Sequence, residues 1–164
     1  LFDSNPGAPE HVRLVEWPAE EKKTLQGIYA KYRLSGVVDP GAILDTTPLL
    51  PDAGYEELIR VAQQCEDVDV GLYSFVPETP AIKSLPDEID DPSSLIARLI
   101  RMHKEGAGKP FVVCMESGWR YNETVDVFHE AGIPCFRHVD EAAAAIKLLS
   151  RAVKLGHSTC LTSS

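Results

Sequence analysis

The sequence lacks an apolar stretch of about 18 residues, the length that spans a bilayer, and no signal-peptide pattern opens it. It also lacks a run of Lys or Arg, and its 16 basic residues are outnumbered by 25 acidic ones, a formal charge of −9. This balance argues against a general nucleic-acid binder and against an anionic-membrane binder. We therefore expect neither nucleic acid nor a membrane among the partners.

Cysteine is also sparse. The four cysteines form no C-x-x-C pair and no zinc-ligand spacing with the five histidines. Cys114 and Cys135 lie inside apolar runs, where a cysteine usually packs as a small hydrophobic residue. This usage favours a reducing, cytoplasmic location. Because the chain begins with Leu1 rather than Met, we expect it to be processed or cut from a longer protein.

What is present is ordinary for one globular domain. Apolar residues make up 44% and charged residues 25% of 164 positions. Residues 1–13 contain two prolines and a glycine and are interpreted as a linker or arm. One compact domain is expected over 14–156, followed by a polar tail over 157–164. No internal repeat or low-complexity tract interrupts this domain.

Helical spacing of apolar residues predicts five helices. The first runs from Pro18, which suits a first helical turn, to about residue 33. The second is expected to be capped by Asp52, and the third to open at Asp91-Pro92 and end at 106–108. A fourth follows from Tyr121 and is closed by Gly132. The last has an apolar stripe and ends near residue 156; the stripe comprises Ala142, Ala145, Ile146, Leu149 and Val153.

Between these helices lie β-rich runs. Residues 36–38 and 42–44 are short runs broken by Pro40-Gly41, and longer or clearer runs occupy 68–76, 111–115 and 133–136. Strands that alternate with helices imply parallel pairing through right-handed crossovers. The pattern therefore predicts an α/β fold: an open parallel sheet of four to five strands with helices on both faces.

Such sheets bind ligands beyond the carboxyl ends of their strands, where the strand order reverses. Four loops qualify, and a 2-1-3-4 strand order would place the first and third on either side of the reversal. Their hydroxyls, carboxylates and glycine could hold a phosphate or contact a neighbouring domain beside helix N-termini. The same residue types also cap ordinary strand-to-helix turns, which is the alternative interpretation. The candidates are Asp45, Thr46, Thr47, Glu78, Thr79, Glu116, Ser117 and Gly118, and the fourth loop is His138-Val139-Asp140.

Familiar catalytic and nucleotide-binding motifs are missing. The sequence has no G-x-x-x-x-G-K-[ST] and no G-x-G-x-x-G after a strand. The loop at Thr46-Thr47-Pro48 has no glycine for a flavin phosphate. The order of Asp45 and Lys109 does not fit a phospho-acceptor receiver domain. His138 has no accompanying nucleophile motif. We therefore expect no catalytic residue and no metal site in this chain.

An ordered series of short motifs carries a family resemblance that covers most of residues 14–156. Asp45, Thr47 and Pro48 stand where a motif close to N-P-V-D-L-T-P would lie. Further along, Asp67-Val68-Asp69 enters one strand, Lys109-Pro110 enters the next, and Gly132-Ile133-Pro134 precedes the last. This series resembles the flavodoxin-like ligase-CoA subdomain of the NDP-forming (ADP-forming) acyl-CoA synthetases, relatives of succinyl-CoA synthetase.

The resemblance implies one subdomain of an acid–thiol ligase, inactive alone. In that family acyl-CoA, ADP and phosphate are converted to acid, CoA and ATP through a phosphohistidine. Here that histidine, CoA and ATP/ADP with Mg would belong to the parent enzyme. The partners would be its CoA-binding Rossmann-like, phosphohistidine and ATP-grasp domains. The alternative is a non-catalytic interaction or regulatory module of the same fold.

The sequence also departs from the family pattern. Glu116-Ser117 replaces a frequent double glycine, which would allow a ligand to approach the backbone closely. An extra loop over 81–91 follows the strand that ends at Val76. None of the five histidines has the glycine-flanked context of a phosphohistidine.

Overall fold

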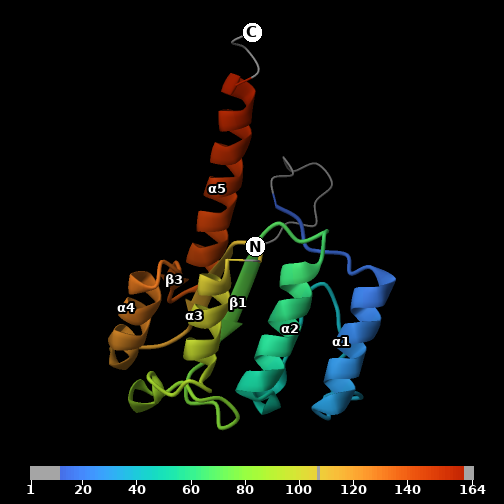
Figure 1. Cartoon of the computed structure of the whole chain (residues 1–164), viewed down its shortest axis with the longest axis vertical. Helices are drawn as coiled ribbons and strands as arrows, with labels where there is room; N and C mark the ends of the chain where they lie inside the picture. Colours follow the sequence, from blue (N-terminus) through green and yellow to red (C-terminus); the bar gives the residue numbers. More distant parts are fainter. Residues whose placement is uncertain (1–11, 107, 161–164) are drawn as a thin grey trace.

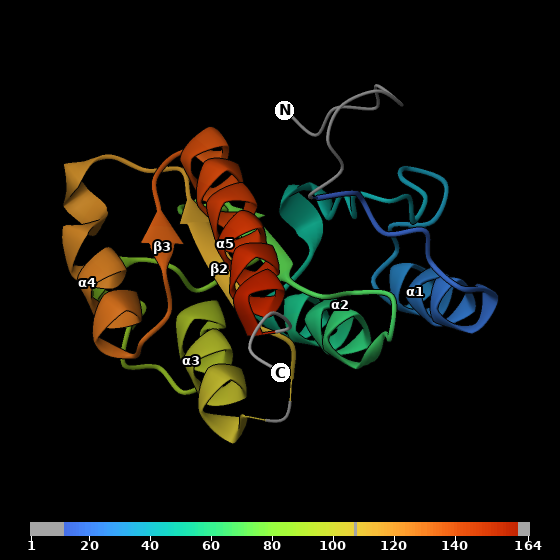
Figure 2. The ribbon, with the colours of Figure 1, turned by 90° about the horizontal axis from the view of Figure 1, so that it is seen from above.

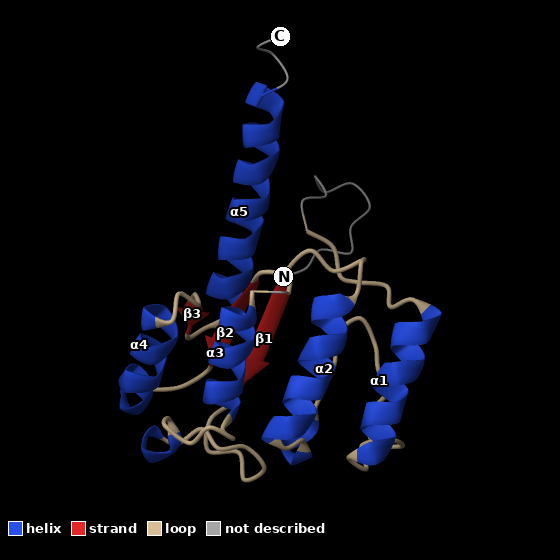
Figure 3. Cartoon of the chain, in the orientation of Figure 1, coloured by secondary structure: helices blue, strands red, loops and turns tan. Residues whose placement is uncertain are grey.

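The computed structural model describes residues 12–106 and 108–160, the last ten of them through their backbone alone. Within these residues three parallel strands form one open sheet in the order β1-β2-β3 (Figure 3). The strands are β1 (Gly71–Phe75), β2 (Phe111–Met115) and β3 (Cys135–Phe136). Phe75 of β1 stands opposite Met115, and Cys114 of β2 stands opposite Phe136. The α/β class with a parallel sheet is confirmed.

The expectation of four to five strands is wrong, because neither segment 36–38 nor segment 42–44 forms a strand. The N–H groups of Val37 and Val38 instead donate to the carbonyl of Leu34, at 3.0 and 3.1 Å, in the turn after the first helix. Pro40 has no N–H to donate to a strand partner. Val37 and Ile43 are each 67% exposed, while Val38 and Leu44 pack at the edge of the apolar cluster that contains Leu25 and Leu50. The expected 2-1-3-4 order with its reversal therefore does not form in the described sheet.

Five α-helices in the described residues confirm the helical periodicity (Figure 1). The last one is longer than expected: it runs to Cys160 rather than ending near residue 156, so residues 157–160 belong to the helix and not to a tail. The third begins three residues later than Pro92, because the hydroxyl of Ser94 accepts a hydrogen bond from the N–H of Ala97 at 3.1 Å. Gly106 and Gly132, with φ of +66° and +82°, follow the third and fourth helices as predicted. The helices are α1 (Ala19–Lys31), α2 (Asp52–Gln64), α3 (Leu95–Glu105), α4 (Asn122–Glu130) and α5 (Val139–Cys160), with 3-10 turns η1 (Thr47–Leu49), η2 (Pro86–Glu88) and η3 (Trp119–Tyr121).

Asp52 does not cap α2 as expected. It is the first residue of that helix, is 8% exposed, and its carboxylate reaches two other segments. Oδ1 accepts a hydrogen bond of 2.6 Å from the N–H of Leu95 and one of 3.1 Å from the N–H of Lys83. Asp52 thereby ties the loop after β1 and the start of α3 to α2. Burial raises the pKa of its carboxyl group, against the lowering effect of these two N–H donors.

A second carboxylate links α2 to α3 farther along the two helices. Glu56, whose side chain is 13% exposed, accepts hydrogen bonds from Arg60, Arg98 and Arg101. Arg60 also pairs with Glu105 of α3 at 3.1 Å. Burial alone would raise the pKa of Glu56, but its three arginine partners lower it overall. The α2–α3 packing is therefore held by charge as well as by apolar contacts.

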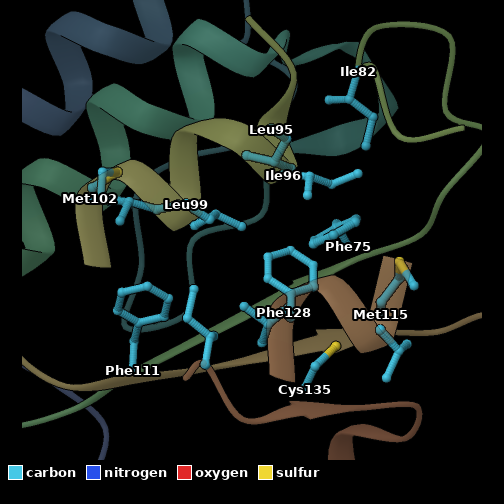
Figure 4. Close-up of a cluster of buried hydrophobic side chains, with 14 of the residues drawn as sticks. Phe75, Ile82, Leu95, Ile96, Leu99, Met102, Phe111, Met115, Phe128 and Cys135 are labelled. Atoms are coloured by element: carbon cyan, nitrogen blue, oxygen red, sulfur yellow. The ribbon is translucent and has the colours of Figure 1, made fainter. Parts of the chain in front are cut away.

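Both faces of the sheet carry helices. Helices α2, α3 and α4 cover the face to which Phe75, Val113 and Met115 point, and a single apolar cluster fills this layer (Figure 4). The opposite face is covered by α5, whose Ala142 and Ile146 pack against β2. The alternation along β2 explains the two layers, because successive side chains of a strand point to opposite faces.

Helix α1 packs on α2. Leu25, Ile28 and Tyr29 of α1 pack with Leu50 and Leu58 in a cluster of their own. Figure 2 shows α1 on the far side of α2 from the strands. The N-terminal quarter of the domain is thus an attached layer rather than part of the sheet core.

The expected packing of Cys114 and Cys135 as small hydrophobic residues is confirmed. Cys114 and Cys135 are buried and unpaired with another cysteine, on opposite faces of the sheet. Burial raises the pKa of the Cys135 thiol to about 12, so it stays neutral in the core. Within the described residues, no helix has both the length and the apolar character needed to cross a membrane.

Candidate functional site

The loops after β1 and β2 are joined by a hydrogen bond that the sequence did not predict. The hydroxyl of Tyr121 donates to Glu78 Oε1 at 2.6 Å, and Arg120 pairs with the same oxygen at 3.3 Å. Tyr121 is 5% exposed, whereas the Glu78 side chain is 55% exposed. Burial, and then the neighbouring carboxylate, raise the pKa of Tyr121 to about 12, so the phenol remains a donor.

The backbone at Glu78 is strained. Its φ is +66°, in the left-handed region that non-glycine residues rarely adopt. The N–H of Glu78 donates to the hydroxyl of the buried Ser84 at 3.3 Å, which helps to hold this conformation. Glu78 is therefore fixed in position by its backbone and its side chain together, while its second carboxylate oxygen is left for another partner.

The loops after β2 and β3 are joined by one arginine. Nη1 of Arg137 donates to the carbonyl and the hydroxyl of Ser117, at 3.1 and 2.9 Å, and to the carbonyl of Gly118 at 2.9 Å. Its Nη2 donates to the side chain of Asn122, the first residue of α4. Ser117 also donates to the carbonyl of Met115 at 3.2 Å. The hydroxyl of Ser117 is thus engaged in shaping the loop.

The first candidate loop is built separately. Asp45 Oδ1 accepts from the N–H of Thr47 at 2.9 Å, and the hydroxyl of Thr46 donates to that of Tyr55 at 2.8 Å. Tyr29 of α1 donates to the carbonyl of Asp45 at 2.7 Å. Among the described residues no hydrogen bond or ion pair connects this loop to Glu78 or Ser117. The structure therefore brings the second and third candidate loops together, and the first stands with α1 and α2.

The remaining candidates have local roles or face solvent. The hydroxyl of Thr79 donates to the carbonyl of Val76 at 2.7 Å, which closes the turn after β1. Glu116 and Gly118 are exposed, and a Cβ placed on Gly118 would meet no atom within 4 Å. Thr79 therefore helps to form a turn, which is the alternative interpretation given above for its residue type. Gly118 leaves open space beside its loop.

Sequence reasoning missed the residues that connect the loops and the apolar side chains beside them. Trp119 is 85% exposed and Val76 is 57% exposed, two residues from Tyr121 and from Glu78 respectively. Because Tyr121 and Glu78 are hydrogen-bonded, both apolar residues belong to the two joined loops. A tryptophan four residues after the apolar run 111–115 is the signal that the sequence offers. We call Val76, Glu78, Trp119, Arg120 and Tyr121 the rim.

The rim has no unpaired arginine among the described residues. Its one guanidinium, Arg120, is paired with Glu78, and nearby Arg137 is held by Ser117, Gly118 and Asn122. The described residues contain no group of three or more His, Cys, Asp or Glu placed to hold a metal ion. A shallow depression of about 620 Å³ lies instead beside α3 and α4, and none of the eight candidate residues lines it.

Comparison with known proteins gives a fold-level likeness. No family model matches the sequence, and no curated protein matches it. Among solved structures the chain is similar to PH0766 from Pyrococcus horikoshii OT3, with a TM-score of 0.62 and 19% sequence identity. The similarity covers 88% of this chain but 31% of that protein. The chain thus has the fold of part of a larger protein.

Proposed function

We propose that this chain is one module of an ADP-forming acyl-CoA synthetase, an acid–thiol ligase, and that it works by contacting the other domains of that enzyme. The motif series supports the proposal, because each motif precedes the element that the family order requires. The Asp45–Pro48 motif leads into α2, Lys109-Pro110 into β2, and Ile133-Pro134 into β3. The likeness to one third of PH0766 is consistent with a module.

The observation that carries the proposal is the exposed rim. A Trp that is 85% exposed and a Val that is 57% exposed flank a fixed carboxylate at the carboxyl end of the sheet. Aromatic residues with an adjacent Arg are enriched where proteins bind other proteins. Because both nearby arginines are already paired, the rim suits a protein surface better than a phosphate-rich cofactor.

In the proposed enzyme, the other domains hold CoA, ATP/ADP with Mg, and the phosphorylated histidine. This chain holds in place the loops that contact those domains. Tyr121 and Arg120 keep Glu78 in place, and Arg137 keeps the Ser117–Gly118 loop beside the start of α4. The backbone N–H groups at that helix start stabilise negative charge brought near by another domain. No group of this chain takes part in bond making.

The test uses the complete reading frame that contains these residues. Its product is assayed for ATP formed from ADP, phosphate and a panel of acyl-CoA thioesters. We expect activity in the complete protein and none in the 164-residue chain alone. Trp119→Ala should lower turnover at least about tenfold, as expected for a central contact residue. Val37→Ala, at a 67% exposed position outside the rim, is the matched control and should leave turnover unchanged.

One observation favours the alternative, a non-catalytic interaction module. The hydroxyl of Ser117 is occupied by Arg137 and by the carbonyl of Met115, and Glu116 stands where the family often has glycine. In that case the complete protein would keep its turnover when Thr47, Glu78 and Ser117 are each replaced by Ala. A complete protein without ADP-dependent ATP synthesis, and without a phosphorylated histidine, would contradict the ligase proposal altogether.

A further inference from the structure

Helix α5 covers the sheet with only part of its length. Ala142, Ala143 and Ile146 in its first half are 0–5% exposed. The next apolar side chains, Leu148 and Leu149, are 69% and 59% exposed. Figure 1 shows the helix continuing past the ends of the other helices. The second half of α5 therefore projects from the domain as an arm, with two large apolar side chains at its base.

The exposure of Leu149 contradicts the sequence expectation. Leu149 belongs by helical spacing to the same stripe as Ala142 and Ile146, which are buried against the sheet. A stripe that continues beyond the surface it covers is typical of a helix with a second packing partner. Leu148 and Leu149 are both more than half exposed, so two large apolar side chains are left uncovered on this helix.

Charge indicates the nature of that partner. After Glu141 the sequence has no acidic residue and three basic ones, Lys147, Arg151 and Lys154. Residues 1–141 therefore hold the other 13 basic residues and all 25 acidic ones, a formal charge of −12. The arm is the cationic segment of a strongly anionic chain, so the body of another copy is electrostatically complementary to it.

Acidic side chains lie at the end of the molecule from which the arm projects. Glu66, Asp67 and Asp69 in the α2–β1 connection are exposed. Figure 1 shows this connection at the amino end of the strands, the end toward which α5 runs. In a two-fold interface each copy must offer both the arm and the surface that binds the arm of the other copy. Here the arm and the acidic surface lie at the same end of the molecule, so one face of each copy can supply both.

We propose that α5 is a dimerisation arm that binds a second copy of this chain. Leu148 and Leu149 of the two copies pack together at the two-fold axis, with the helices antiparallel. From Leu149 to Cys160 the helix rises about 16 Å, at 1.5 Å per residue. That length carries the basic part of each arm toward the Glu66–Asp69 connection of the other copy. The inference is independent of the proposed ligase function, because it uses neither the rim nor its partners.

The test is the mass of the 164-residue chain in solution, measured by light scattering and sedimentation velocity. We expect twice the 18.0 kDa of one chain. The double variant Leu148→Glu, Leu149→Glu should be monomeric, with its dissociation constant raised about a hundredfold or more, as for loss of central apolar contacts. Its circular dichroism should be unchanged, since both side chains are already exposed. Leu49→Glu, at a 64% exposed leucine before α2, is the matched control and should remain dimeric.

The ionic part has its own test. The double variant Asp67→Lys, Asp69→Lys should weaken the dimer, whereas Asp87→Lys, at an exposed acid outside this connection, should not. Added salt should also weaken the wild-type dimer. A wild-type chain that stays monomeric up to about 100 µM, well above ordinary specific affinities, would overturn the proposal. So would a dimer that survives the Leu148 and Leu149 changes, or one that Leu49→Glu breaks equally.

Discussion

Replacing Asp52 by Ala should destabilise the domain more than any other single change of an acidic residue considered above. The carboxylate accepts from the N–H of Leu95 at 2.6 Å and from the N–H of Lys83 at 3.1 Å. Leu95 is 1% exposed, so no water can replace the lost acceptor at its N–H. A buried donor left without a partner costs about 1–3 kcal/mol, and the half-buried Lys83 N–H adds about 0.5–1 kcal/mol.

The expected loss is therefore about 2–4 kcal/mol, a large share of the roughly 5–15 kcal/mol that stabilises a typical domain. For a chain of this size that loss lowers Tm by roughly 5–15 °C. Asp52→Asn keeps one acceptor oxygen and should cost less than about 1.5 kcal/mol. Asp87 is an exposed acid in the loop after β1, which also contains Lys83, and the free energy of unfolding of Asp87→Ala should stay within about 0.5 kcal/mol of wild type. Urea unfolding followed by circular dichroism measures all three.

The pH dependence supplies a second check on Asp52. Burial raises its pKa in the folded state, so the folded protein binds this proton more tightly than the unfolded chain does. The resulting stability is present below the unfolded pKa of about 3.9 and is lost as pH rises through the folded value. The stability of wild type relative to Asp52→Asn should therefore fall as pH rises from about 3.5 to 7. An Asp52→Ala loss no larger than that of Asp87→Ala would refute the reasoning, as would a pH trend of the opposite sign.

Three smaller predictions follow from other contacts. Glu56→Gln should cost about 1–2 kcal/mol at pH 7. Because the pKa of Glu56 is lowered in the fold, that stability is present above the unfolded pKa of about 4.3 and should be lost in urea titrations as pH falls from there through the lowered folded value. Gly132→Ala should cost about 1 kcal/mol, since φ there is +82°, whereas Gly118→Ala, at φ −84° with open space, should be nearly neutral in thermal unfolding. Tyr121→Phe should cost about 0.5–1.5 kcal/mol through its lost bond to Glu78, and an unchanged Tm would contradict that bond.

Much of the fold could be predicted from the sequence because its signals are local. Segment 111–115 is apolar at every position and was placed as a strand with the bounds it has in the structure. Gly106 and Gly132 ended their helices as expected, because a left-handed φ after a helix favours glycine. Segments 36–38 and 42–44 carried β-forming residues too, but a short run becomes a strand only where a partner strand lies beside it.

The candidate site could be predicted only in part, because the sequence indicates loop residues but not their distant partners. Loop residues were identified by type and place, so Glu78, Ser117 and Gly118 were named. The residues that hold them, Tyr121 and Arg137, make contacts across 43 and 20 positions of sequence. Side-chain pairs so far apart leave no periodic pattern in a single sequence. Asp52 was misassigned for the same reason, because its partners lie 31 and 43 positions away rather than in its own helix.

The strand order has a consequence for how the chain is made. Because β1, β2 and β3 are neighbours in the order in which they occur along the described chain, no strand must insert between two that are already paired. As synthesis proceeds from the N-terminus, α1 and α2 can pack first, and each later strand adds to the free edge left by the strand before it. Assembly on the ribosome can therefore follow translation step by step, with α5 closing the second face last.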